Sequence, residues 1–371
     1  MAVIQPRLLT SETGMKFWAA MLCFGAILLD CAAPPKAAGR LDRYLTSLQD
    51  SGFSGVVIVA GKQGILLSKG YGLADRSNEI PASPNTLFQI GSLTKQFTAA
   101  AILKLELEGR LTVQDPITRF LRDVPADKRG ITIHQLLTHT AGLPDVVGGC
   151  SSRESGDRDA QVKRVLGAKL ESPAGTGYRY SSAGYGLLGA IIEIASGQRY
   201  EAYLRQHLFR PAGMDGTGYS FKASDSNRIA RGYRDNQEYR GIINAWVGDG
   251  PVWCVRASGG LLSTAEDMYR WHQALRGTRV LSEPAKRKYF ARQVPEQPEE
   301  TSFYGYGWSI SKTRRGTPVI GHDGSIGDYF TADYRWYVDE GAFYFVAANT
   351  AEHTAMGVSP RIGALLFDET E

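Results

Sequence analysis

Hydrophobic residues cluster in short runs near both ends of the chain, and these runs predict strands. Residues 53–60 and 65–72 are apolar, β-branched stretches separated by a Gly-Lys-Gln-Gly segment at 61–64, which is the pattern of a β-hairpin. The C-terminal third contains four more strand-like runs, at 306–311, 318–322, 329–338 and 343–349. We expect the strands from the two ends to pair in one antiparallel sheet.

The middle of the chain changes to helical periodicity. A helix is predicted over residues 92–108, beginning at Ser92 and stopped by Gly109. Further helical runs lie at 132–137, at 183–195, from Thr264 onward and at 356–367. The order strands, helices, strands predicts an α+β fold: an antiparallel β-sheet flanked by helices, with an inserted helical subdomain at about residues 110–250 and a cleft at the junction.

The N-terminus has the pattern of a targeting segment. Lys16 precedes an apolar run at 17–29, and small residues follow, as in a secretory signal. The run is shorter than the roughly 18 residues of a membrane span. We therefore assign residues 1–38 to a signal region, with Met15 as an alternative start, and residues 39–371 to one exported domain. We expect that domain to be periplasmic or secreted, without a membrane span once the signal is removed.

The four cysteines divide between the signal region and the exported domain. Cys31 stands where a lipoprotein cysteine would stand, but the acidic Asp30 directly before it argues against a lipid anchor. Cys150 and Cys254 remain in the exported domain, where an oxidising compartment favours a disulfide between them. The alternative is two free or buried thiols.

Composition excludes several classes of function. The chain has 371 residues, of which 43% are hydrophobic, enough for a large core, and its net charge is only +4. It contains no long run of lysine and arginine, so we expect no nucleic-acid partner. His-Glu-x-x-His and other metal-ligand spacings are absent from the sequence, so we expect no metal and no cofactor. The expected partner is a small-molecule or peptide substrate.

The segment Ser92-Leu93-Thr94-Lys95 is the first candidate for chemistry. A serine and a lysine three residues apart on a helix share one face, with their β-carbons about 5–6 Å apart. A serine at a helix N-terminus lies in the positive end of the helix dipole. A partly desolvated lysine has a lowered pKa and can act as a base. The tetrapeptide alone is common, however, and a capping serine beside a surface lysine explains it equally well.

Two later polar clusters favour the catalytic interpretation of this tetrapeptide over the capping one. One surrounds Tyr180 at 178–185, and the other, at 321–325, follows a predicted strand. Together with Ser92 and Lys95 they come from all three sections of the fold, and we expect them to converge on one cleft. His139 is interpreted as structural. The alternatives for Tyr180 and His322 are a core tyrosine and a strand-end histidine without a role.

The order of these motifs resembles the serine β-lactamase and penicillin-binding superfamily, in the branch of class C β-lactamases, D-aminopeptidases, D-Ala-D-Ala carboxypeptidases and related esterases. That branch combines S-x-x-K with Tyr-x-Asn and with Lys- or His-x-Gly. The matching segments are 92–95, Tyr180-Ser181-Ser182 and His322-Asp323-Gly324. The resemblance extends over about residues 40–367, including 136–144, 185–189 and 259–264.

The resemblance implies catalytic roles for three residues. Ser92 would attack a carbonyl carbon and form an acyl-enzyme. Lys95 would accept its proton or keep Tyr180 poised. Tyr180, whose unperturbed pKa is near 10, would act as acid or base only if cations such as Lys95 lower that pKa.

The resemblance also implies how a substrate is held. The backbone N–H groups of Ser92 and Ser325 would form the oxyanion hole. Ser182, His322, Asp323 and Gly324 would contact the substrate, with Gly324 leaving room for its backbone and His322 offering a donor to a carboxylate or a proton route.

Two of these positions depart from the family pattern. Ser182 replaces the usual asparagine and offers fewer hydrogen bonds to a substrate amide. His322 replaces the lysine of efficient class C β-lactamases, which weakens attraction for a carboxylate. We therefore expect a serine hydrolase acting on an ester, a D-amino-acid peptide or an amide. The alternatives are a catalytically weak protein that binds or senses cell-wall fragments and, less favoured, a true β-lactamase.

Overall fold

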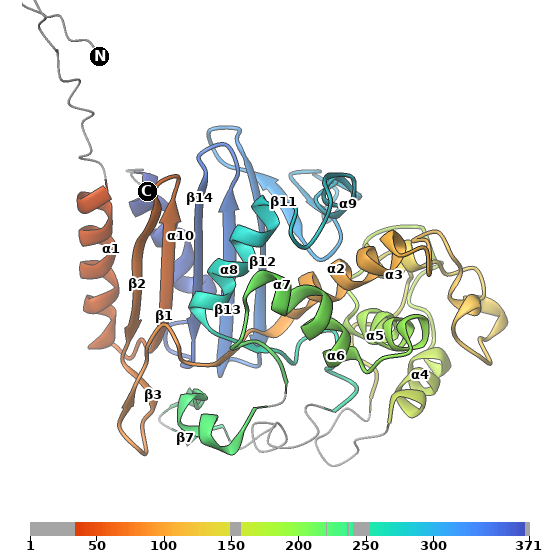
Figure 1. The fold of residues 1–371 in the computed structure, drawn as a ribbon, viewed down its shortest axis with the longest axis horizontal. Helices are drawn as coiled ribbons and strands as arrows, with labels where there is room; N and C mark the ends of the chain where they lie inside the picture. Colours follow the sequence, from red (N-terminus) through yellow and green to blue (C-terminus); the bar gives the residue numbers. More distant parts are fainter. Residues whose placement is uncertain (1–33, 149–156, 220, 236, 240–251, 368–371) are drawn as a thin grey trace, which may run out of the picture. The chain divides into compact units, whose positions relative to one another are not determined.

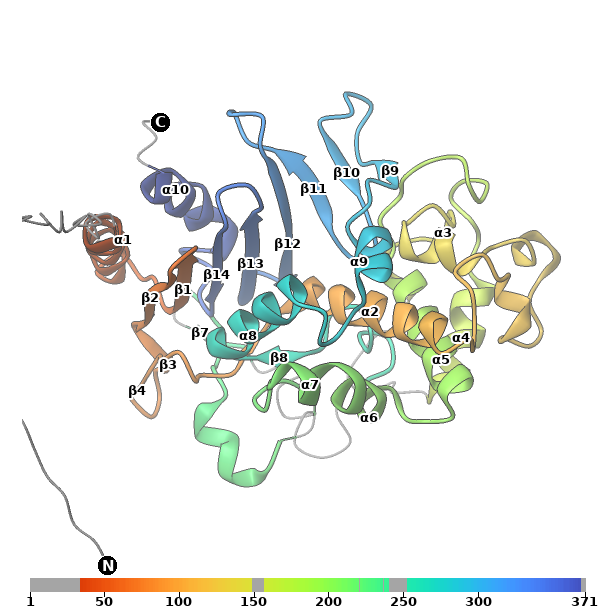
Figure 2. The same ribbon diagram turned by 45° about the horizontal axis from the view of Figure 1, so that its top comes forward.

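An eight-stranded antiparallel sheet forms the centre of the protein (Figures 1 and 2). The computed structural model describes residues 34–148, 157–219, 221–235, 237–239 and 252–367. The strand order is β2-β1-β14-β13-β12-β11-β10-β9, so the N-terminal hairpin pairs with the C-terminal strand. The bounds are β1 Gly55–Gly61, β2 Gly64–Tyr71, β9 Val294–Pro295, β10 Ser302–Tyr304, β11 Ser309–Lys312, β12 Pro318–Ile326, β13 Phe330–Tyr337 and β14 Ala342–Ala348.

Helices cover both faces of this sheet. Helices α1 (Pro34–Gln49) and α10 (Ala355–Phe367) pack on one face, and α8 (Ala265–Arg276) packs on the other. Strand β1 is therefore apolar at every position: Val56 and Ile58 belong to the core under α8, and Val57 and Val59 belong to the smaller core under α1 and α10. This arrangement confirms the predicted α+β fold with a flanked antiparallel sheet.

A helical region extends from one end of α2 (Thr94–Leu107), as Figure 1 shows. Its centre is the apolar helix α5, which contacts α2, α3, α4 and α6. The bounds are α3 Ile133–Leu137, α4 Arg158–Gly167, α5 Ser182–Ser196, α6 Tyr200–Leu204, α7 Arg210–Ala212 and α9 Glu283–Tyr289. Helices α3 to α7 lie within the predicted insertion of 110–250, of which residues 149–156, 220, 236 and 240–250 are outside the described part.

The N-terminal end differs from the sequence-based picture in one respect. Helix α1 begins at Pro34, inside the segment assigned to the signal region, and the sequence pattern did not predict it. Residues 1–33, which hold the predicted signal, lie outside the described residues. Within the described part of the chain, no helix is both long enough and apolar enough to cross a membrane.

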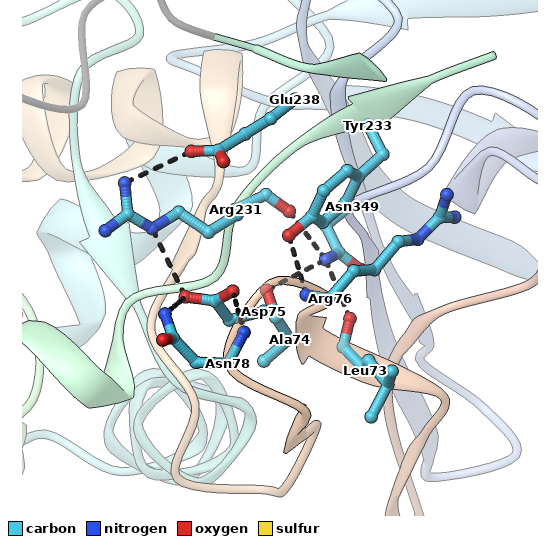
Figure 3. A network of polar contacts seen from close by, with 9 residues as sticks. All are labelled: Leu73, Ala74, Asp75, Arg76, Asn78, Arg231, Tyr233, Glu238 and Asn349. Carbon is cyan, nitrogen blue, oxygen red and sulfur yellow. Dashed lines mark hydrogen bonds and ion pairs between the residues drawn. The ribbon is translucent and has the colours of Figure 1, made fainter. Parts of the chain in front are cut away.

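A polar network joins three distant segments at one end of the sheet (Figure 3). The buried Asn349, which directly follows β14, donates from Nδ2 to the carbonyl oxygens of Leu73, Ala74 and Arg231 at 3.2, 3.3 and 2.7 Å. The Arg231 guanidinium in turn lies 3.6 Å from the buried carboxylate of Asp75. One amide side chain thus supplies hydrogen bonds to two chain segments that have left the sheet.

We expect Asn349→Ala to lower the free energy of unfolding by about 2–3 kcal/mol, because it removes the hydrogen bonds that the buried Asn349 amide donates and leaves carbonyl oxygens short of donors. Urea unfolding monitored by circular dichroism measures this. The matched control is Asn78→Ala, in an exposed residue of the same network with one side-chain bond to Asp75. We expect the control to change stability by less than about 0.5 kcal/mol. Equal midpoints for the two variants would contradict a special role for Asn349.

Candidate active site

Ser92 lies at the junction between the sheet and α2. The short strand β5 (Phe88–Gln89) leads through Ile90 into a 3-10 turn at Gly91–Leu93, which continues as α2. Gly91 has φ +52°, and a β-carbon there would lie 2.5 Å from the backbone nitrogen of Ser325. Only glycine satisfies both constraints without strain. The turn is thereby pressed against β12, and the half-buried Ser92 stands at its centre.

Lys95 is fully buried beside Ser92. Its Nζ lies 3.1 Å from Ser92 Oγ, 3.3 Å from Ser182 Oγ and 2.8 Å from the carbonyl oxygen of Ser258. Burial lowers the pKa of Lys95 to about 7, although the carboxylates of Asp145 and Asp323 act in the opposite direction. A large fraction of this lysine is therefore a neutral amine near pH 7, in contact with the hydroxyl it would deprotonate.

Tyr180 covers the lysine. Lys95 Nζ lies 4.6 Å from the centroid of its ring. Burial raises the pKa of the Tyr180 phenol above its usual value, and a hydrogen bond with the Ser92 side chain only partly offsets this. Tyr180 would act as a phenolate base only if neighbouring cations lowered its pKa, and this condition is not met. At neutral pH its hydroxyl is protonated and suited to donating a hydrogen bond.

The ring of Tyr180 rests on a buried aromatic cluster. His139 lies between Tyr180, Tyr185 and Tyr304, with centroid distances of 4.3, 5.0 and 4.6 Å. Its Nδ1 accepts a hydrogen bond from the Ser181 backbone N–H at 3.0 Å, and burial holds its pKa well below the usual value. His139 is thus a neutral packing residue that positions the Tyr180 segment, in agreement with its structural interpretation.

Ser182 begins helix α5 and faces the lysine. Ser181 caps this helix, its Oγ accepting from the Gly184 backbone N–H at 3.0 Å. The Ser182 backbone N–H donates to Asp145 Oδ1 at 2.8 Å, which brings a carboxylate close to Lys95. Asp145 belongs to none of the sequence motifs described above. Its only sequence signal was its place directly after the family-like segment 136–144.

Strand β12 passes closely in front of Ser92. A β-carbon at Gly324 would lie 2.2 Å from the Ile90 carbonyl oxygen and 2.8 Å from the Ser92 backbone nitrogen. Strand β11 pairs with β12 only as far as Gly321, so no described strand covers that edge of residues 322–326. The close contacts of Gly91 and Gly324 bring the backbone N–H groups of Ser92 and Ser325 to the same place.

His322 and Asp323 point to opposite faces of the sheet. His322 is buried; its Nδ1–H donates to the Asp323 carbonyl oxygen at 2.6 Å, and its Nε2 accepts from the Tyr304 hydroxyl at 2.9 Å. Burial lowers the pKa of His322 to about 4, so the ring is neutral and both nitrogens are occupied. The exposed Asp323 pairs in register with Asp333 on the α10 side. Among the described residues, neither side chain is hydrogen-bonded to Ser92.

We expect Gly324→Ala to lower kcat/KM by at least about 100-fold, because the added methyl group must push β12 away from Ser92, and displacements near 1 Å have effects of this size. Steady-state kinetics with an ester substrate measures it. Gly130→Ala is the matched control, since a β-carbon at Gly130 meets no atom within 4 Å. Wild-type rates in Gly324→Ala would contradict the close approach of β12 to Ser92.

One of the two cysteines of the predicted exported domain lies in the described part of the chain. Cys254 is disulfide-bonded. Cys150 lies outside the described residues, so the pairing of Cys150 with Cys254 stays a prediction. Within the described ranges, no group of three or more His, Cys, Asp or Glu side chains is arranged to hold a metal ion.

Comparisons with known proteins identify the family and the fold of this chain. Penicillin-binding protein 4* of Bacillus subtilis (strain 168) is 29% identical over 325 residues, which cover 81% of this chain and 69% of the relative. The structure of a penicillin-binding protein homologue from Pyrococcus abyssi has a TM-score of 0.76 and 25% identity, covering 90% of this chain and 78% of that one. D-amino acid amidase from Ochrobactrum anthropi SV3 shares the fold, with a TM-score of 0.74, 23% identity and coverage of 90% and 98%. The sequence model of the β-lactamase family matches residues 41–364, so the chain belongs to the β-lactamase family.

Proposed function

We propose that this protein is a serine hydrolase that forms an acyl-enzyme through Ser92 on an ester, a D-amino-acid peptide or an amide. One observation carries the proposal. A fully buried lysine amine with a pKa of about 7 lies 3.1 Å from the Ser92 hydroxyl oxygen. A serine hydroxyl is a weak nucleophile by itself, and a neighbouring base of matched pKa is what activates it.

The acylation step follows from these contacts. Neutral Lys95 takes the proton of Ser92 as Oγ attacks the carbonyl carbon of the substrate. The carbonyl oxygen becomes negatively charged and accepts hydrogen bonds from the backbone N–H groups of Ser92 and Ser325, each typically contributing about 2.7–4 kcal/mol. The bond to the leaving group then breaks, and the ester of Ser92 remains until water hydrolyses it.

Tyr180 fits the role of proton donor better than that of base. Its phenol is protonated at neutral pH because burial raises its pKa, and its ring lies against Lys95. In the proposed reaction the Tyr180 hydroxyl passes a proton to the departing oxygen or nitrogen and recovers it from the Lys95 ammonium. The predicted catalytic role of Tyr180 is thus proposed to be that of an acid, which donates a proton to the leaving group.

The substrate class is proposed from the residues that surround Ser92. Ser182 Oγ contacts Lys95 Nζ at 3.3 Å and has only one hydroxyl to offer a substrate amide. His322 is neutral with both ring nitrogens occupied, so it adds no positive charge for a β-lactam carboxylate. These features favour a simple ester or a D-amino-acid amide over a β-lactam, and slow acylation by penicillins fits them as well. Export to the periplasm or the medium belongs to the same proposal.

A hydrolase panel tests the proposal. It consists of short acyl esters, D-amino-acid amides, a D-Ala-D-Ala peptide and a chromogenic cephalosporin, each with the wild type and with Ser92→Ala. We expect Ser92-dependent turnover of an ester or amide, with cephalosporin hydrolysis near background. Labelling of Ser92 by a fluorophosphonate without turnover of any member would instead support the weak binding or sensing protein. Fast cephalosporin hydrolysis would support a true β-lactamase.

A further inference from the structure

A second cavity lies on the side of the sheet away from Ser92. It has a volume of about 480 Å³ and opens between α10 and strands β11 to β13. In Figures 1 and 2, α10 covers the sheet face opposite α8 and α2. The volume is within the roughly 300–1,000 Å³ typical of small-molecule sites. None of the residues proposed to act on Ser92 lines this cavity, so it is independent of the proposed reaction.

The charge of this cavity is strongly positive. Its lining contains four cationic side chains, those of Lys312, Arg314, Arg315 and Arg335. Among the lining residues that the structure describes, the one carboxylate belongs to Asp333, which is fully buried, and Arg335 Nε lies 2.9 Å from its Oδ1. Asp333 is therefore already neutralised within the protein and does not offset the other three cations.

Two of these cations are available to a ligand. Arg315 is engaged by Glu340 at 2.9 Å. Lys312 and Arg314 are exposed, and neither lies within ion-pair distance of a carboxylate among the residues that the structure describes. A carboxylate or phosphate oxygen at the mouth of the cavity would thus meet two unneutralised charges.

The rest of the lining is apolar. Val319 and Tyr337 from the sheet face Met356, Pro360 and Phe367 from α10. Helix α10 approaches the sheet closely at Gly363, where a β-carbon would lie 2.8 Å from the Tyr337 hydroxyl oxygen. The cavity therefore combines a positive mouth with apolar walls, which is the chemistry of a ligand with an anionic head and an apolar body.

We propose that this cavity binds an amphipathic anion, a carboxylate or a phosphate monoester carrying an alkyl chain or an aromatic ring. The anionic head lies between Lys312 and Arg314, with Arg335 behind it, and the apolar part packs against Tyr337, Met356 and Phe367. The shared chemistry of the head is a group with two or more terminal oxygens. The bidentate geometry of arginine suits such a group.

Isothermal titration calorimetry of the full chain tests the site with four probes. Decanoate and decyl phosphate, both below their micelle concentrations, carry head and chain; decanol lacks the charge, and inorganic phosphate lacks the chain. We expect Kd on the order of 100 µM for at least one of the two amphiphilic anions, and binding at least about tenfold weaker for decanol and for phosphate. A stronger response to decanoate or to decyl phosphate identifies the head group. Equal affinity for decanol, equal affinity for phosphate, or no binding of either anion would each overturn the proposal.

Variants locate the binding in this cavity. Lys312→Gln combined with Arg314→Gln removes the two available charges, and Ala364→Trp fills the space beside Gly363 with a bulky ring. We expect both to weaken binding of the anion at least about tenfold, with near-wild-type thermal unfolding for the double variant. The matched control is Arg279→Gln combined with Arg287→Gln, two exposed arginines outside the cavity. Unchanged affinity in the Lys312 and Arg314 double variant would assign the binding to another place and overturn the proposal.

Discussion

Ser92→Ala is expected to abolish turnover of every substrate that the wild-type protein hydrolyses, with kcat falling by about 10⁴–10⁶-fold, as in other hydrolases that lose their nucleophile. The physical reason is that no other hydroxyl in the described part of the chain lies within hydrogen-bond distance of Lys95 Nζ except that of Ser182. Covalent labelling by a fluorophosphonate, read by intact mass, should disappear in the same variant.

The controls for this variant separate loss of chemistry from loss of fold. Ser68→Ala, on the edge strand β2, should label and turn over like the wild type. Ser92→Ala should unfold at a similar temperature, because it removes one oxygen from a half-buried side chain. Labelling that persists in Ser92→Ala and moves to Ser182 in peptide mapping would overturn the assignment of the nucleophile.

Lys95→Met should lower kcat/KM by about 10²–10⁴-fold, the usual range for removal of a general base. In the wild type, kcat/KM should fall tenfold per pH unit below about pH 7, because protonated Lys95 cannot accept the proton of Ser92. The remaining activity of Lys95→Met should lack this acid limb. Lys104→Met, farther along the same helix, should keep the wild-type profile. A limb near pH 7 that survives in Lys95→Met would assign the base to another group.

The same substitution should stabilise the protein near neutral pH. The pKa of Lys95 is 10.5 in the unfolded chain and about 7 in the folded protein, so between these values unfolding takes up a proton. The contribution of Lys95 to stability is therefore unfavourable at pH 7 and improves as the pH rises toward 10.5. We expect Lys95→Met to raise the free energy of unfolding by about 2 kcal/mol at pH 7 and by much less at pH 10. The value at pH 7 includes the cost of leaving the Ser258 carbonyl without its hydrogen-bond donor. A gain in the free energy of unfolding that is as large at pH 10 as at pH 7 would contradict a neutral Lys95.

Local features of the protein were readable from the sequence because they depend on near neighbours. The hairpin of β1 and β2 follows from two apolar, β-branched runs on either side of residues 61–64. A helix was expected from Thr264 onward, and Thr264 Oγ1 caps that helix by accepting from the Asp267 backbone N–H at 3.1 Å. The serine and lysine of the first motif share a helix face because three residues make nearly one turn, and their side chains meet at 3.1 Å.

The motif segments could be found in the sequence, but the directions in which their side chains point could not be predicted from it. A strand alternates its side chains between two faces, and which face each takes depends on the register with the neighbouring strand. Register with β13 and contact with Tyr304 turn the His322 ring into the protein and place Asp323 on the α10 side. The sequence motif grouped both as substrate contacts, whereas the structure separates them.

The sequence by itself determined the periodic elements, the α+β class and the S-x-x-K pair, since each rests on spacing within a few residues. Only the tertiary structure decided the electrostatics of Lys95. Its partner carbonyl belongs to Ser258, 163 residues away, and Asp145 approaches through the start of α5. A backbone carbonyl carries no residue-type signal, and desolvation depends on every segment packed around the amine. The lowered pKa of Lys95 is therefore a property of the folded protein and not of the tetrapeptide.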